Sequence, residues 1–357
     1  MKPYPRNRPA RSAEHGSRPS GVVRSLVSPP AEPRTTCGSG RVIAFGRPAA
    51  GAPAGSQPAP SPAGLDATLR SAARVLEPRQ AVVLPADPAG GGPVALRSAG
   101  WMSCARLLTP QGLEQVLAEI RQQHGASNEV AVSYLAAWYA GNIVGPAIAA
   151  FVIAGRVPDL TRERMSVHRT DDGWFDATAF HTSRMTVLPT DPLLAAVAAD
   201  AGPARADLLA AGVVDVAEDV PALRARLVAE IVGHLEPVIS ALRGRARLGL
   251  PALWGAVSAQ CARTFLLTER VTGDPHRGRQ EADAFFALAC PPLRARPTWH
   301  EFVHRGRHHT GMRRGACCLA HRLTAEFCTT CPFTPDEERE RRLRELIDTQ
   351  GYDVIAV

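Results

Sequence analysis

Several motifs found in redox enzymes and nucleotide-binding proteins are missing from this 357-residue sequence. No glycine-rich loop follows a strand pattern and opens a helix, and the run Gly90–Gly92 has no helical pattern behind it. No flavin motif, internal repeat or catalytic acid–base constellation can be identified. A redox function would therefore require electrons from a separate donor.

The start of the chain also lacks the features of a signal peptide. Charged residues recur there, and no long apolar run precedes the short stretch Ala81–Leu84. Cysteines of a protein that stays in the cytoplasm remain mostly reduced. We therefore expect a cytoplasmic protein with free or metal-bound thiols.

A basic surface is not expected on the folded part of the chain, although the net charge is +7. Residues 1–95 carry twelve Lys and Arg against five Asp and Glu, whereas the remaining residues carry 29 of each sign. The positive charge thus belongs to the N-terminal segment, and the sequence gives little support for nucleic-acid binding by the folded part.

The composition divides the chain into three parts. Residues 1–95 are rich in Pro, Ala, Gly, Ser and Arg, and we predict a disordered tail through at least residue 63 with a short helix at Asp66–Leu76. Residues 96–300 are predicted to form the main domain. Residues 301–357 are predicted to form a C-terminal metal-binding segment and a terminal helix.

The expected fold is α+β, mainly α-helical with a small antiparallel sheet. Helices are predicted at Pro110–Gln123 with Thr109 as its cap, Asp191–Asp200, Asp219–Arg243, Leu253–Thr268, Gln280–Ala289 and Thr334–Ile347. Strands or extended segments are predicted at Val94–Leu108, Met165–Arg169, Trp174–Phe180, Met185–Leu188 and Thr298–Val303.

The segment Val130–Gly155 contains no charged residue and is long enough to cross a membrane. Polar side chains and the helix-breaking pair Gly145 and Pro146 lie near its middle, and no second such segment follows. We therefore expect two buried core helices, broken near Gly145–Pro146, and at most peripheral contact with a membrane.

Four of the eight cysteines lie within fifteen residues near the C-terminus. They are Cys317, Cys318, Cys328 and Cys331, and Pro332 follows the last. Closely spaced thiols in a chain without an export signal favour a metal site over disulfides or chance clustering. The adjacent pair Cys317–Cys318 does not have the spacing of a zinc knuckle, and Cys-Pro also ends ferredoxin motifs. The pattern therefore favours an iron–sulfur cluster over Zn²⁺.

This stretch resembles the signature of the FhuF-like ferric siderophore reductases, in which an adjacent cysteine pair precedes a Cys-x2-Cys-Pro. The nine-residue spacer here is slightly shorter than is typical of that family. The lead-in Arg313–Gly315 and the spacer residues Arg322 and Leu323 also match, and a weaker similarity extends from Trp101 to Trp254. The resemblance implies that Cys317, Cys318, Cys328 and Cys331 bind a 2Fe–2S cluster.

The function implied by the resemblance is one-electron reduction of a ferric siderophore, which releases iron in the cytoplasm. An external donor, such as a ferredoxin or a flavin or NAD(P)H reductase, would supply the electron. Nearby positive charge raises the potential of a cluster and attracts anionic partners. Candidates for this role, chosen by proximity in the sequence, are Arg313, Arg314, His321 and Arg322.

Other hypotheses remain open at this point. The cysteines could hold Zn²⁺ in a non-catalytic module, or form an iron–sulfur sensor that regulates transcription, or belong to a siderophore-biosynthesis relative without reductase activity. Residues considered for additional roles are His304, His308 and His309 as metal ligands, and Asp159, Asp172, Trp174, Asp176 and Trp254 as parts of a substrate site.

Overall fold

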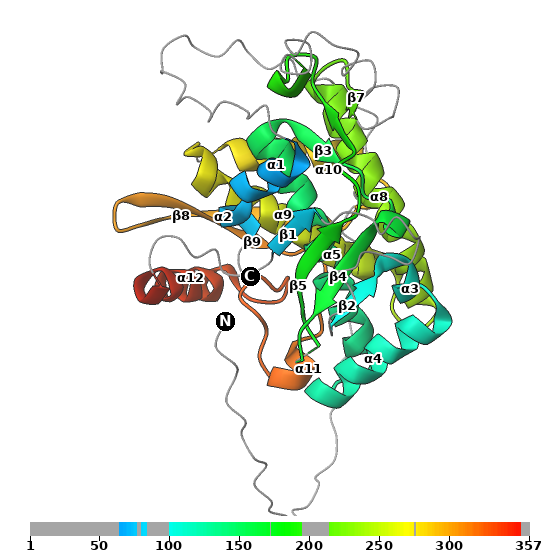
Figure 1. Cartoon of the computed structure of the whole chain (residues 1–357). Coiled ribbons are helices and arrows are strands. Elements are labelled where there is room, and N and C mark those ends of the chain that lie inside the picture. Colours follow the sequence, from blue (N-terminus) through cyan, green and yellow to red (C-terminus); the bar gives the residue numbers. More distant parts are fainter. Residues whose placement is uncertain are drawn as a thin grey trace, which may run out of the picture. The chain divides into compact units, whose positions relative to one another are not determined.

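A single long helix, α5 (Asn128–Ala154), lies among the other large helices of the computed structural model (Figure 1). The structure describes residues 64–76, 80–83, 100–171, 173–194, 214–274 and 276–350, all within one compact unit that runs from Ala44 to Val357. α5 is buried along nearly its whole length. A helix that is apolar on all sides requires such complete coverage.

The predicted break of α5 at Gly145–Pro146 is wrong, because the helix continues through Pro146. Proline has no N–H to donate to the carbonyl four residues earlier, which is that of Asn142. The Thr178 hydroxyl donates to this carbonyl instead, at 2.9 Å. The strand that carries Thr178 thus supplies the hydrogen bond that proline removes, and the helix is not interrupted.

Helices cover α5 on several sides. α4 (Pro110–His124), α8 (Val220–Arg243) and α9 (Leu250–Thr272) pack directly against it, and α10 (Arg277–Leu288) packs on α9. These four helices were expected, and α9 is longer than predicted. The Thr109 hydroxyl caps α4 by accepting from the amide of Gly112, and the Asp219 carboxylate caps α8. By length and composition α5 could span a membrane, but its most apolar window is fully buried in protein.

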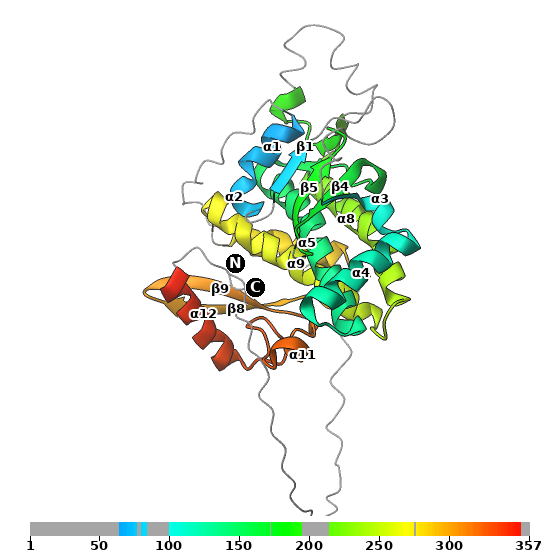
Figure 2. The ribbon, with the colours of Figure 1, turned by 60° about the horizontal axis from the view of Figure 1, so that its bottom comes forward.

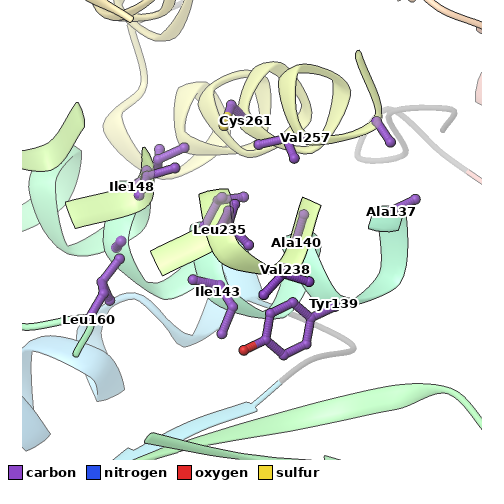
Figure 3. Close-up of a cluster of buried hydrophobic side chains, with 14 of the residues drawn as sticks. Ala137, Tyr139, Ala140, Ile143, Ile148, Leu160, Leu235, Val238, Val257 and Cys261 are labelled. Carbon is purple, nitrogen blue, oxygen red and sulfur yellow. The ribbon is translucent and has the colours of Figure 1, made fainter. Parts of the chain in front are cut away.

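Side chains from α5, α8 and α9 meet in the core. Figure 3 shows Tyr139 and Ile143 of α5 against Leu235 and Val238 of α8, with Val257 of α9 above them. These side chains are almost completely removed from water. Burial of this kind is the main term that stabilises a folded chain.

Two mixed sheets flank the helices. The first has the strand order β1-β5-β4-β2, and the second has the order β3-β6-β7. The pairs β1–β5 and β6–β7 are parallel, and the other neighbours are antiparallel. The strands are β1 (Gln80–Val83), β2 (Trp101–Ser103), β3 (Arg156–Pro158), β4 (Met165–Arg169), β5 (Phe175–Phe180), β6 (Met185–Val187) and β7 (Val214–Val216).

The predicted strands β4 and β5 are confirmed, and they pair antiparallel with Met165 opposite Phe180. The predicted third strand, β6, exists but lies in the other sheet beside β3. The fold is therefore α+β and mainly helical as expected, while its sheets are mixed rather than purely antiparallel.

Short helices complete the main part of the fold. They are α1 (Leu65–Ser71), α2 (Ala73–Leu76), α3 (Cys104–Leu107) and the 3-10 turn η2 (Arg162–Arg164). The helix predicted at Asp66–Leu76 is confirmed as two pieces. The end of the predicted extended segment Val94–Leu108 is instead α3, whose first turn is capped by the Ser103 hydroxyl. The predictions for residues 1–63, Gly90–Gly92, residues 94–99 and residues 195–200 of the helix predicted at Asp191–Asp200 lie outside the described residues.

The C-terminal segment consists of a hairpin and two helices. Strands β8 (Thr298–His304) and β9 (Arg307–Arg313) pair antiparallel, followed by α11 (His321–Thr324) and α12 (Asp336–Gln350). α12 lies along the hairpin (Figure 2), where Leu343 and Ile347 pack on Phe302. Strand β9 was not predicted, because its basic residues do not show the alternation of apolar and polar side chains that indicates a strand. The predicted division of residues 96–357 at residue 300 stays a prediction.

Candidate metal centre

The four clustered cysteines come together between β9 and α12. Cys317 and Cys318 follow β9, and Cys328 and Cys331 precede α12, with α11 in between. The Sγ atoms of Cys317 and Cys331 are 3.9 Å apart, and the thiols of Cys318 and Cys328 are hydrogen-bonded to each other. The site is thus built from two thiol pairs, each with one member from either cysteine motif.

The pair of Cys317 and Cys331 has the spacing that a shared metal ion requires. Two sulfur ligands on one tetrahedral metal, each with a bond of about 2.3 Å, lie about 3.8 Å apart. The Cys317–Cys331 distance of 3.9 Å matches this value. Within the described part of the chain, no three or more His, Cys, Asp or Glu side chains converge as ligands of a single ion.

Hydrogen-bond donors of the loop point at the sulfur atoms. The amide of Leu319 donates to the Sγ of Cys317 at 3.4 Å, and the amide of Ala320 donates to Cys318. The hydrogen bond with Cys328 lowers the pKa of the Cys318 thiol, helped by the charge of Arg314. The same hydrogen bond raises the pKa of the Cys328 thiol. These contacts favour the thiolate form, which is the form that binds metal, at Cys318, whereas burial raises the pKa of the Cys317 thiol.

Three of the four predicted residues contact the cysteine loop, Arg313 and His321 by their side chains and Arg314 by its backbone. Arg314 is buried, and its backbone amide donates to the carbonyl of Thr330 at 2.8 Å. The guanidinium of Arg313 donates to the carbonyl of Pro332 at 3.0 Å. The Nδ1 of His321 lies 3.7 Å from the Sγ of Cys317.

Arg322 differs from these three. It is on the exposed side of α11, and no contact of its side chain with the cysteines is found in the described residues. Of the four predicted residues, Arg313, Arg314 and His321 therefore lie beside the cysteine loop, while Arg322 faces solvent.

Arg339 was not predicted as a site residue, although its side chain holds the cysteine loop in place. Its guanidinium is completely buried and donates to the carbonyls of Thr329 and Thr334 at 2.7 Å and to that of Cys331 at 3.3 Å. Arg339, Leu343 and Ile347 are spaced four residues apart on one face of α12. This spacing predicts a shared buried face, and it was the signal that could have identified Arg339.

The predicted helix start at Thr334 is wrong. α12 begins at Asp336, and the Thr334 hydroxyl donates to the carbonyl of Cys328 at 2.8 Å. Thr334 therefore stabilises the turn that contains Cys328 and Cys331 rather than the start of α12.

The cysteine segment is also attached to the main helices. The hydroxyl of Ser133 on α5 donates to the carbonyl of Cys318 at 3.0 Å. Gly315 lies so close to the neighbouring chain that a Cβ atom there would be 2.3 Å from the carbonyl oxygen of Ala295. Side chains of Leu319 and Leu323 pack on the main core.

The other candidate residues lie away from the thiols or serve other contacts. His304, on the β8–β9 hairpin, pairs with Asp348 at 2.6 Å. Asp159 pairs with Arg164, while Trp254 is buried in the core. Of the five residues considered for a substrate site, Trp174 has an exposed side chain, Asp176 pairs with His168, and Asp172 lies outside the described residues.

Comparisons with known proteins agree with the sequence resemblance. The family model described as "Ferric iron reductase FhuF-like transporter" matches residues 133–307. The match begins at the serine that contacts Cys318 and ends in the β8–β9 hairpin, so the four cysteines follow the matched region. A comparison with curated proteins gives no match. The family match, which covers about half of the chain, places it in the ferric iron reductase FhuF-like family.

Proposed function

We propose that this protein reduces ferric siderophores in the cytoplasm by one electron, using a 2Fe–2S cluster held by Cys317, Cys318, Cys328 and Cys331. The observation that carries the proposal is the arrangement of these thiols in two pairs, with 3.9 Å between the sulfur atoms of Cys317 and Cys331. The family match supports ferric iron reduction in general.

A cluster at this position would supply single electrons, and one electron converts Fe(III) to Fe(II). The hard oxygen ligands of a siderophore hold Fe(III) more tightly than Fe(II), so the reduced iron leaves the chelate more readily. The balance is one electron taken from an external ferredoxin or from a flavin or NAD(P)H reductase, and one electron given to the iron of the substrate.

The surrounding residues favour the additional negative charge of a reduced site. The buried guanidinium of Arg314 acts on Cys318 and Cys328 through its charge, and the amides of Leu319 and Ala320 donate to sulfur atoms. Buried donors of this kind stabilise negative charge more strongly than water-exposed ones. The exposed side chains of Arg313 and Arg322 lie near the same loop and suit an acidic electron donor.

Anaerobic purification followed by metal analysis tests this proposal. We expect red-brown protein with about two irons per chain, and a low-temperature EPR signal after reduction. Cys328→Ser should lose the signal and the iron, whereas Cys261→Ala, which changes a buried free thiol of α9, should keep both. Reduced protein should convert a ferric chelate stoichiometrically to Fe(II), detected with a ferrous-specific dye.

Other outcomes would favour the alternatives. Colourless protein with about one zinc per chain after anaerobic reconstitution would refute the proposal and leave a zinc-stabilised module. Salt-sensitive retention on DNA would support the sensor hypothesis, which the equal numbers of acidic and basic residues beyond residue 95 disfavour.

A further inference from the structure

Four aromatic rings from separate parts of the chain form one cluster next to the cysteine loop. They are His124 at the end of α4, Tyr134 and Trp138 on α5, and Trp174 just before β5. The rings of Trp138 and Trp174 are 3.9 Å apart, and those of Tyr134 and Trp138 are 4.9 Å apart. The His124 ring lies 5.3 Å from Trp138 and 5.9 Å from Trp174. We call these four residues the aromatic face.

Part of the aromatic face is open to solvent. Trp174 is 40% exposed, while the indole of Trp138 beneath it is only 7% exposed. A large exposed ring packed against a buried one offers a rigid surface for a flat or apolar ligand. Because the partner ring is fixed on α5, the exposed indole is held in place at little additional entropic cost.

The aromatic face also contains an unused polar atom. The Nε2 of His124 is buried and has no hydrogen-bond partner among the described residues. Most buried polar atoms in proteins are paired, so an unpaired one near an exposed aromatic surface is typical of a ligand site. Imidazole can donate or accept there, depending on its tautomer.

The aromatic face lies close to the thiols. Ser133, whose hydroxyl contacts the carbonyl of Cys318, directly precedes Tyr134 on α5. Trp138 follows Tyr134 by one helical turn, a rise of about 6 Å. Both Figure 1 and Figure 2 place α11 of the cysteine segment beside the end of α4 that carries His124.

The two cations of β4, the strand next to β5, are already paired. Arg169 pairs with Glu119 of α4, and His168 pairs with Asp176. Neither cation is therefore available to neutralise a highly anionic ligand. An uncharged chelate with apolar surface fits this environment better than a trianionic one.

We propose that the aromatic face, formed by His124, Tyr134, Trp138 and Trp174, binds the ferric chelate beside the cysteine site. This inference rests on the proposed function. The chelate class is one with little net negative charge, whose apolar or aromatic outer surface stacks on Trp174 while the Nε2 of His124 hydrogen-bonds to one of its polar atoms.

Binding of redox-inert gallium(III) complexes tests the inference separately from electron transfer. We would titrate an uncharged gallium trihydroxamate into wild type, Trp174→Ala, Trp174→Phe and His124→Phe by calorimetry. Leu288→Ala, which removes a 50% exposed side chain at the end of α10, is the control. We expect Kd to rise roughly tenfold for Trp174→Ala and His124→Phe, and less than about threefold for Trp174→Phe and the control.

The possible results separate the two proposals. Unchanged gallium binding by Trp174→Ala and His124→Phe, in protein that keeps the wild-type iron content and EPR signal, would overturn the aromatic face as the site. Equal or tighter binding of a trianionic gallium tris-catecholate would overturn the assigned chelate class. If the wild type contains no iron but binds the gallium complex, and these variants do not bind it, the result would support the aromatic face and refute the proposed cluster.

Discussion

Replacement of Arg339 by Met should destabilise the C-terminal segment more than any exposed arginine substitution in α12. The guanidinium is completely buried and supplies donors to the carbonyls of Thr329, Cys331 and Thr334. Methionine fills much of the same volume but donates no hydrogen bond. The three carbonyls would remain buried without this donor.

The expected magnitude follows from the number of these bonds. An unsatisfied buried acceptor costs about 1–3 kcal/mol, and some carbonyls recover part of this loss by admitting water. Three carbonyls together give a decrease of about 3–5 kcal/mol in the free energy of unfolding. A loss of this size is a large part of the 5–15 kcal/mol that stabilises a typical domain, as an order of magnitude.

Urea unfolding, followed by circular dichroism and by release of bound metal, measures this effect. Arg341→Met is the matched control, because Arg341 is on the exposed side of the same helix and pairs with Glu338. We expect no measurable change for the control. The free energy of unfolding of Arg339→Lys should lie between those of wild type and Arg339→Met, since an ammonium group cannot reproduce the planar set of donors of a guanidinium. A midpoint for Arg339→Met equal to that of Arg341→Met would refute the reasoning.

Three further substitutions test other parts of the structure. Arg156→Met removes one partner of a buried two-bond ion pair with Asp191, both bonds being 2.8 Å, and should lower the free energy of unfolding by about 3–5 kcal/mol in urea titrations. Burial lowers the pKa of His234 from 6.5 to about 4, so the unfolded chain binds a proton first and stability should fall between pH 6.5 and 4, by about 3 kcal/mol in total. Replacing His234 by Gln should remove this part of the pH dependence. Gly315→Ala should displace the cysteine segment and reduce the bound iron, measured per chain, whereas Gly233→Ala should not.

Each of these predictions has a result that would contradict it. A loss below about 1 kcal/mol for Arg156→Met would mean that the pair is readily solvated. An identical pH dependence with and without His234 would assign the acid lability to other groups. The added methyl group of Gly315→Ala has no room in the present packing. Full iron content in this variant would therefore mean that the chain at Ala295 moves aside easily.

Local sequence signals predicted the helix starts well. Thr109 and Asp219 cap the helices that their positions indicated, because a cap depends on contacts within one turn. The four cysteines were also found from their spacing. Their pairing across the two motifs was not, since it depends on how the loop folds.

The errors arose where a distant residue decides the outcome. Pro146 does not break α5, because Thr178 supplies the donor for the freed carbonyl from another strand. The parallel pairing of β1 with β5 joins segments nearly a hundred residues apart, which no local pattern indicates. Arg339 was not identified as a buried residue, because a charged side chain does not indicate a place on the apolar face of α12.

The attachment of the cysteine segment to α5 limits how the site can be transferred between proteins. Small zinc modules carry their ligands and their scaffold in one short peptide. Here the loop depends on the hydroxyl of Ser133, nearly two hundred residues upstream, and on close contact of Gly315 with the chain at Ala295. A peptide of the last sixty residues would contain the four clustered thiols but not α5, the helix against which they are positioned. Grafting this centre onto another scaffold would therefore mean transplanting part of the helical core as well.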